Sequence, residues 1–191
     1  AGLTGEGTRF QTVEAALRLG VNTVRSSSMG RLFDAAAALL NICHYNSYEG
    51  ECAILLEQAA AQAESAYPLS FPVKGQDGCL VGDSAALIRA MREGQERGAS
   101  PTSLALGFHH AVAGLTLAIC QHQRAASGVK QVALSGGTFQ NRILLERTAA
   151  LLRADGFTVY YNRQVPPGDG GLALGQAWLT ILAEKNDDKA I

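Results

Sequence analysis

The sequence lacks several features that would each point to a class of protein. No two cysteines are separated by only two residues, which argues against a zinc ribbon and against a disulfide framework. We expect the cysteines to be small, buried apolar residues of a protein in the reducing cytoplasm. No apolar run reaches the roughly 20 residues of a membrane span, and we expect no signal peptide. The four cysteines are Cys43, Cys52, Cys79 and Cys120.

Strong charge of either sign is also lacking. The 191 residues carry 16 basic and 17 acidic side chains, for a net charge of −1 at pH 7. Such a chain has no broad basic field, so we expect neither a nucleic acid nor a membrane as its partner. The chain begins at Ala1 and not at Met, which favours a processed protein or an excised fragment.

The residues that are present favour a well-buried globular core. Hydrophobic residues make up 47% of the sequence and charged residues only 17%. Residues 1–66 form a predicted helical segment, because apolar residues recur at helical spacing in three places. These places are residues 10–19, 29–40 and 53–66, and the serines at 26–28 can cap the second helix. Residues 186–191 form a charged tail that we expect to fray.

Residues 67–185 alternate between short apolar runs and helical patterns. Runs at 69–73 and 79–81 flank a Gly/Asp turn at 74–78 and predict a hairpin. The remaining predicted elements are helices at 84–97 and 100–124, a strand at 132–134, a helix at 141–153, a strand at 157–161 and a helix at 172–182. The last four form a βαβα unit, so the predicted fold class is α/β with one small mixed sheet.

Two loops follow the last two predicted strands. Residues 135–141 lead from a strand through small residues to a helix N-terminus, where free backbone N–H groups and the positive helix end can hold a phosphate. Residues 166–171 place the lone carboxylate of Asp169 in a turn stiffened by proline and glycine. Together the two loops predict a site for phosphate transfer or adenylation.

A hairpin followed by a βαβα unit resembles one lobe of the actin/sugar-kinase/Hsp70-like fold, in which two lobes enclose a nucleotide. Four strings extend the resemblance, namely SSMGRLFD at 27–34, YEG at 48–50, LSGGTFQN at 134–141, and PPGDGG at 166–171 followed by Gly175 and Gln176. Together they resemble the C-terminal actin-like (Kae1-like) region of HypF, a family of carbamoyltransferases that mature [NiFe]-hydrogenases. The likeness covers roughly residues 10–182, although Glu51 stands where the family often has Gln.

The resemblance implies one lobe of a larger transferase. HypF enzymes use carbamoyl phosphate and ATP to form carbamoyl adenylate, and they pass the carbamoyl group to the C-terminal cysteine of HypE during synthesis of the hydrogenase cyanide ligand. By the same resemblance the site adjoins a divalent metal, iron or zinc, held partly by histidines of an HxxxH arrangement that this chain does not contain. The other domains of the enzyme are also missing, so we expect the isolated chain to fold without catalysing transfer.

Four of the expected nucleotide-binding residues lie in the first loop. Ser135, Gly136 and Gly137 would let the backbone approach a phosphate closely, because a Cβ atom would obstruct it. A tight turn after a strand is the structural alternative. Asn141 could cap the following helix, bind nucleotide as the resemblance implies, or do both.

Two further nucleotide-binding residues are expected in the N-terminal segment. Asp34 would accept hydrogen bonds from ribose hydroxyls, unless it is a solvated residue of its helix. Arg31 could neutralise a phosphate or simply pair with Asp34 along the helix. Gly50 could pack its backbone against the sugar or base, or serve only as a turn between helices.

Asp169 is the one predicted metal ligand, because a hard carboxylate oxygen can bind iron, zinc or magnesium. Aspartate also favours turns for conformational reasons, which is the alternative. The histidines are not assigned to the metal, since adjacent His109 and His110 point about 100° apart on a helix. We expect one of them to pack or to bind backbone, and His44 and His122 to lie at the surface. No catalytic nucleophile is recognisable.

Three classes of function remain open at this point. The first is the carbamoyltransferase lobe. The second is a lobe of a tRNA threonylcarbamoyladenosine synthase or of an actin-like kinase, which the strings at 27–34 and 166–171 disfavour. The third is a non-catalytic nucleotide-binding module that contacts a maturation partner.

Overall fold

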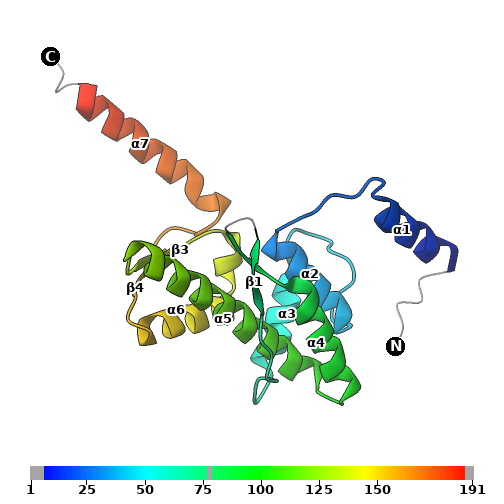
Figure 1. Ribbon diagram of the computed structural model, residues 1–191. Coiled ribbons are helices and arrows are strands. Elements are labelled where there is room, and N and C mark those ends of the chain that lie inside the picture. Colours follow the sequence, from blue (N-terminus) through cyan, green and yellow to red (C-terminus); the bar gives the residue numbers. More distant parts are fainter. Residues whose placement is uncertain (1–6, 77–78, 188–191) are drawn as a thin grey trace.

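The computed structural model describes residues 7–76 and 79–187, and most of its helices gather around one long helix, α5 (Figure 1). The N-terminal helices are α1 (Gly7–Leu19), α2 (Met29–Leu39) and α3 (Glu51–Ala61). A hairpin of β1 (Val73–Gln76) and β2 (Cys79–Gly82) leads to α4 (Ser84–Glu96) and α5 (Pro101–Ser127). The C-terminal part contains β3 (Gln131–Leu134), the 3₁₀ turn η1 (Gly137–Gln140), α6 (Arg142–Ala154), β4 (Thr158–Tyr161), the 3₁₀ turn η2 (Asp169–Gly171) and α7 (Leu172–Asp187).

Helix boundaries follow local capping chemistry. The Ser28 hydroxyl accepts a hydrogen bond from the Arg31 N–H at 3.4 Å and starts α2, as the serine-rich segment predicted. Ser100 caps α5 in the same way, with Pro101 at the first helical position. Gly128 ends α5 in a left-handed conformation that glycine adopts without strain. The two helix starts were predicted because their causes lie within one turn of the chain, whereas α5 ends three residues beyond its predicted end at 124.

Helix α5 is the centre of the main hydrophobic core. Its Leu104, Phe108 and Val112 are almost completely buried, and the ring of Phe33 from α2 lies edge-on to Phe108 at 4.9 Å between ring centroids. Among the described residues, α5 is the one helix long and apolar enough to cross a membrane by length and composition. Half of the apolar window that meets this test is buried in the fold, so packing against α3, α4 and α6 accounts for its composition.

The fold is α/β, but its described strands form two separate sheets where one mixed sheet was expected. The hairpin β1–β2 is antiparallel, with Val73 opposite Gly82, and β3–β4 is a parallel pair with Leu134 opposite Tyr161. The first hairpin strand also begins later than predicted. Pro72 precedes it and uses its carbonyl to accept a hydrogen bond from the Asp83 N–H at 2.7 Å, while Phe71 is buried in the core. Part of the predicted turn, residues 77–78, lies outside the described residues.

The prediction that the cysteines are buried and form no disulfide is confirmed only in part: Cys43 and Cys52 are buried in the core, but they are paired with each other. Cys43 and Cys52 form a disulfide between the turn after α2 and the first turn of α3, and their Cα atoms are 5.2 Å apart. Cys79 is exposed, whereas Cys120 is half-buried with a thiol pKa raised by that burial. The left-handed backbone of Asn41 reverses the chain after α2, and this reversal could not be inferred from cysteine spacing.

Helices α1 and α7 project from the body at its two ends (Figure 1). Trp178 and Leu179 of α7 are 59% and 67% exposed, and Leu17 of α1 is 65% exposed. Helix α7 continues to Asp187, so residues 186–187 are helical, and residues 188–191 lie outside the described part of the chain. Both projecting helices therefore leave large apolar side chains uncovered.

Candidate functional site

One cavity of about 730 Å³ collects most of the residues that the sequence singled out. Asp34 reaches it from α2, Gly50 from the turn before α3, and Gly137, Asn141 and Asp169 from the two C-terminal loops. These residues come from segments separated by up to 135 positions, so their common location is a property of the fold. The volume lies within the range of small-molecule binding pockets.

Ser135 and Gly136 are not among the residues that line this cavity, and their hydrogen bonds hold its two loops together. The Gly136 N–H donates to the Pro167 carbonyl at 2.8 Å, and the Ser135 hydroxyl donates to the same oxygen at 3.4 Å. A Cβ atom at Gly168 would lie 2.8 Å from the Gln140 amide nitrogen, so glycine allows the loops to touch. The structure shows that Ser135 and Gly136 pair the two loops, while the predicted role in approaching a phosphate stays a prediction.

The N-terminus of α6 is not free, contrary to the expectation that it would face a phosphate. The Glu57 carboxylate accepts hydrogen bonds from the N–H groups of Arg142 at 2.6 Å and Ile143 at 3.2 Å. The Asn141 side-chain oxygen accepts from the Leu144 N–H at 2.8 Å and caps the helix. Side chains therefore occupy the first three donors of α6.

The turn η1 supplies the available donors instead. It separates β3 from α6, and among the described residues the N–H groups of Gly137 and Thr138 have no hydrogen-bond partner. Both residues line the cavity. Successive unpaired N–H groups of this kind can form a small anion-binding concavity, so η1 is the part of this loop that could bind an anion.

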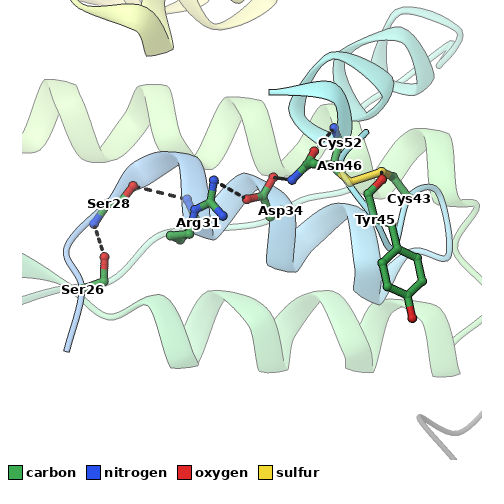
Figure 2. A network of polar contacts seen from close by, with 8 residues as sticks. All are labelled: Ser26, Ser28, Arg31, Asp34, Cys43, Tyr45, Asn46 and Cys52. Atoms are coloured by element: carbon green, nitrogen blue, oxygen red, sulfur yellow. Dashed lines mark hydrogen bonds and ion pairs between the residues drawn. A yellow bond between two sulfur atoms is a disulfide. The ribbon is translucent and has the colours of Figure 1, made fainter. Parts of the chain in front are cut away.

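A chain of polar contacts leads from Ser26 to Asp34 (Figure 2). The guanidinium of Arg31 forms an ion pair with Asp34 at 3.0 Å, which is the pairing considered from the sequence. The Asn46 amide donates to the other carboxylate oxygen of Asp34 at 3.4 Å and accepts from the Cys52 N–H at 2.8 Å. Figure 2 shows Asn46 between Asp34 and the disulfide, so the carboxylate that is expected to meet ribose is braced by both α2 and α3.

Gly50 has a conformational reason to be glycine. Its φ of 81° lies in the left-handed region, and it occupies the N-cap position of α3. Ala53, Ile54 and Glu57, which follow at helical spacing, line the same cavity as Gly50. Glu57 was not singled out from the sequence, although its position two turns after Gly50 on the same helix face is the signal that could have found it.

Asn141 also contacts a buried histidine. Its amide nitrogen lies 2.9 Å from Nε2 of His109, and Nδ1 of His109 lies 2.7 Å from the Ala105 carbonyl oxygen. Burial, together with the neighbouring His110, lowers the pKa of His109 to about 4 despite the backbone hydrogen bond. The expectation that one of the two histidines binds backbone is confirmed, and His44 and His122 are exposed as predicted.

The charged side chains around the cavity are mostly acidic. Arg31 and four carboxylate side chains line the cavity, and Arg31 forms an ion pair with one of the four, Asp34. The described residues contain no group of three or more His, Cys, Asp or Glu side chains suited to a metal ion. The role of Asp169 as a metal ligand therefore stays a prediction. The four carboxylates are those of Asp34, Glu49, Glu57 and Asp169.

Comparison with known protein families identifies the family of this chain. The family described as "Carbamoyltransferase, Kae1-like Domain, second subdomain" matches residues 3–176. The chain belongs to the HypF carbamoyltransferase family. It is 36% identical over 162 residues to carbamoyltransferase HypF of Synechocystis sp., covering 84% of this chain and 20% of that protein. It is 40% identical over 178 residues to a HypF homolog of Cupriavidus necator, covering 88% of this chain and 44% of that protein.

Solved HypF structures share the fold. Full-length HypF in its phosphate- and nucleotide-bound form superposes with a TM-score of 0.82 and 35% identity, covering 90% of this chain and 22% of that chain. HypF of T. kodakarensis gives a TM-score of 0.78 and 33% identity over 94% of this chain and 23% of its own. The chain thus spans less than half the length of these HypF relatives.

Proposed function

We propose that this chain supplies the nucleotide-binding side of a HypF active site, which transfers a carbamoyl group through carbamoyl adenylate to the C-terminal cysteine of HypE. The observation that carries the proposal is the convergence of Asp34, Gly137 and Asn141 on one cavity in a chain of this family. Carbamoyl phosphate and ATP are the proposed substrates. The remaining parts of the enzyme are proposed to complete the site.

The described residues suggest how a nucleotide would lie. In the proposed complex the N–H groups of Gly137 and Thr138, which are unpaired and line the cavity, would donate to phosphate oxygens. Asp34 would accept from ribose hydroxyls, after exchanging its contact with Asn46 or Arg31. Glu57 covers the end of α6, so phosphate is directed toward η1 and away from that helix.

The proposed transfer step needs a good leaving group but no nucleophile from this chain, because the attacking sulfur belongs to HypE. The HypE thiol gives its proton to water, its sulfur attacks the carbamoyl carbon, and the bond from that carbon to the AMP phosphate oxygen breaks. The products are the S-carbamoylated cysteine and AMP. In this step the residues of η1 would stabilise the negative charge that AMP retains. Asp169 is proposed as one ligand of a divalent iron or zinc ion whose other ligands come from outside this chain, and such an ion would polarise bound oxygen atoms.

A second candidate is a lobe of a threonylcarbamoyl-transferring enzyme. The chain is 26% identical over 159 residues to a tRNA N6-adenosine threonylcarbamoyltransferase of Thermus thermophilus, covering 83% of this chain. The identities to HypF proteins are higher, and the net charge of −1 offers little attraction to tRNA. A non-catalytic nucleotide-binding module is the third candidate, because the catalytic residues of this chain are unassigned.

Calorimetric titration with ATP and a non-hydrolysable carbamoyl-adenylate mimic tests the proposal. Gly137→Val should abolish binding, since its side chain would enter the cavity where a Cβ atom meets no protein atom. Asp169→Ala should leave nucleotide affinity within about threefold, because its proposed partner is the metal. Lack of binding by the unchanged chain, or equal binding by Gly137→Val, would contradict the nucleotide role.

The isolated chain is expected to lack transferase activity. It would not label a HypE C-terminal peptide with carbamoyl phosphate and ATP, because the proposed site needs the rest of the enzyme. Labelling by this chain alone at the rate of a full-length HypF would overturn that expectation. The same assay in full-length HypF that carries the Gly137→Val substitution at the matching position separates a binding defect from a missing domain.

A further inference from the structure

His109 is the most deeply buried ionisable side chain next to the cavity. It lies in the middle of α5 with no exposed surface, and the rings of Phe33 and Phe108 approach it edge-on at 5.3 and 5.9 Å between centroids. Neither phenylalanine can satisfy a ring nitrogen. A buried polar ring of this kind is retained without penalty only if both nitrogens find partners, and both do.

The partners determine the tautomer. The Ala105 carbonyl can only accept, so Nδ1 of His109 must carry the proton and donate to it at 2.7 Å. Nε2 is then an acceptor, and it faces the Asn141 amide nitrogen at 2.9 Å. Independently, the Asn141 oxygen must point at the Leu144 N–H, which fixes the amide so that its nitrogen faces His109. All three hydrogen bonds are consistent with a single, neutral arrangement.

We propose that His109 is a positioning residue that holds the Asn141 amide in one orientation at the cavity wall, an inference that rests on the proposed nucleotide role of that cavity. Of the amide's two N–H groups, one is committed to His109 and one remains. Asn141 would therefore offer a donor to the nucleotide, and the nucleotide atom that meets it would be an acceptor. Without His109 the amide nitrogen would lose its partner, and a flipped amide would also give up the helix cap.

Two substitutions of His109 can separate its hydrogen bonding from its packing. Glutamine carries an acceptor and a donor on one neutral group, so His109→Gln can in principle bridge Ala105 and Asn141. Phenylalanine fills the ring volume beside Phe33 and Phe108 but offers Asn141 no acceptor. The pair of variants separates hydrogen bonding from packing. His122→Phe, at an exposed position on the same helix, is the matched control.

Titration of each variant with ATP and Mg²⁺ is the test, with ¹⁵N-imidazole NMR of the unchanged chain beside it. We expect His109→Phe to weaken ATP binding at least tenfold, and His109→Gln and His122→Phe to stay within about threefold. The NMR spectrum should show His109 neutral with its proton on Nδ1, and the Asn141 side-chain amide protected from exchange.

The proposal is overturned if His109→Phe binds ATP as the unchanged chain does, or if His109 carries its proton on Nε2. Equal loss of binding in His109→Gln and His109→Phe also overturns it, because packing alone would then explain the effect. Failure of the unchanged chain to bind ATP would refute the proposed function of the cavity. In that case the NMR tautomer and the Asn141 amide signal still decide whether His109 holds Asn141.

Discussion

At the scale of single residues, adjacent glycines can serve different purposes. Gly136 has φ 96° and ψ 162°, a conformation that is almost confined to glycine, and its N–H binds the second loop. Gly137 has no positive φ, and a Cβ atom there would meet no protein atom within 4 Å. The backbone requires glycine at position 136, whereas glycine at position 137 leaves open space at the lining of the cavity.

This difference predicts that alanine at position 136 mainly lowers stability, whereas alanine at position 137 mainly weakens ATP binding. Gly136→Ala should lower the free energy of unfolding by roughly 1–3 kcal/mol, the usual cost of such backbone strain. Gly137→Ala should change it by less than about 0.5 kcal/mol while weakening ATP binding. Urea denaturation and calorimetry of both variants provide the comparison. A Gly136→Ala protein as stable as the unchanged chain would contradict the assignment.

Buried His109 predicts a pH dependence of stability. Its pKa is lowered to about 4 in the folded state, against an ordinary value of 6.5, so the unfolded chain binds a proton that the folded chain excludes between these pH values. Stability should be fully present above pH 6.5 and decline as the pH falls toward 4. The decline from pH 7 to pH 5 should be about 2 kcal/mol from this group.

His109→Gln removes this ionisation and is the informative variant. Urea unfolding at pH 7 and pH 5 should show a smaller acid loss in the variant than in the unchanged chain. His110 contributes in the same direction, since burial and Arg147 lower its pKa, so His110→Gln serves as a parallel measurement. An identical acid loss with and without His109 would refute the linkage.

At the scale of elements, local patterns predicted most helices but not how their ends are joined. The helices α2, α4, α5 and α6 begin within one residue of their predicted positions. The two 3₁₀ turns were missed, because η1 and η2 depend on loop pairing between Gly136 and Pro167 more than on periodicity. The separation of the strands into two sheets was missed as well. The sequence shows that α4 and α5 come between the hairpin and β3, but not whether the hairpin pairs with β3 or β4 in space.

The connection between α2 and α3 gives a prediction of its own. Titration of thiols in denaturant without reductant should detect two of the four cysteines, Cys79 and Cys120, and all four after reduction. Cys52→Ala should lower the free energy of unfolding under oxidising conditions by about 2–3 kcal/mol, as expected for a short disulfide loop. Under reducing conditions that difference should largely vanish. Four reactive thiols before reduction would contradict the disulfide.

At the scale of the whole molecule, the cavity is acidic while its proposed ligand is an anion. Four carboxylates and one arginine line it, and the arginine is already paired with Asp34. The backbone donors of η1 offset only part of this repulsion. We therefore expect ATP binding to weaken at least tenfold when divalent cations are removed with a chelator.

Calorimetry with and without Mg²⁺ measures this dependence. Glu57→Gln is a useful companion, because the amide oxygen can still accept from the N–H groups of α6 while one negative charge is removed. It should bind ATP more tightly than the unchanged chain, most clearly without Mg²⁺. Equal affinity with and without the cation would show that the acidic lining does not face the phosphates.

The sequence by itself determined the helical segments, the loop residues and the membership in the HypF family, because these depend on residues close together along the chain or on continuous strings. Tertiary structure alone decided the rest. Glu57 reaches Arg142 across 85 positions, and Asn141 reaches His109 across 32. Such pairs form only when α3, α5 and α6 pack together, since helical periodicity specifies which face of each helix is apolar but not which partner it meets.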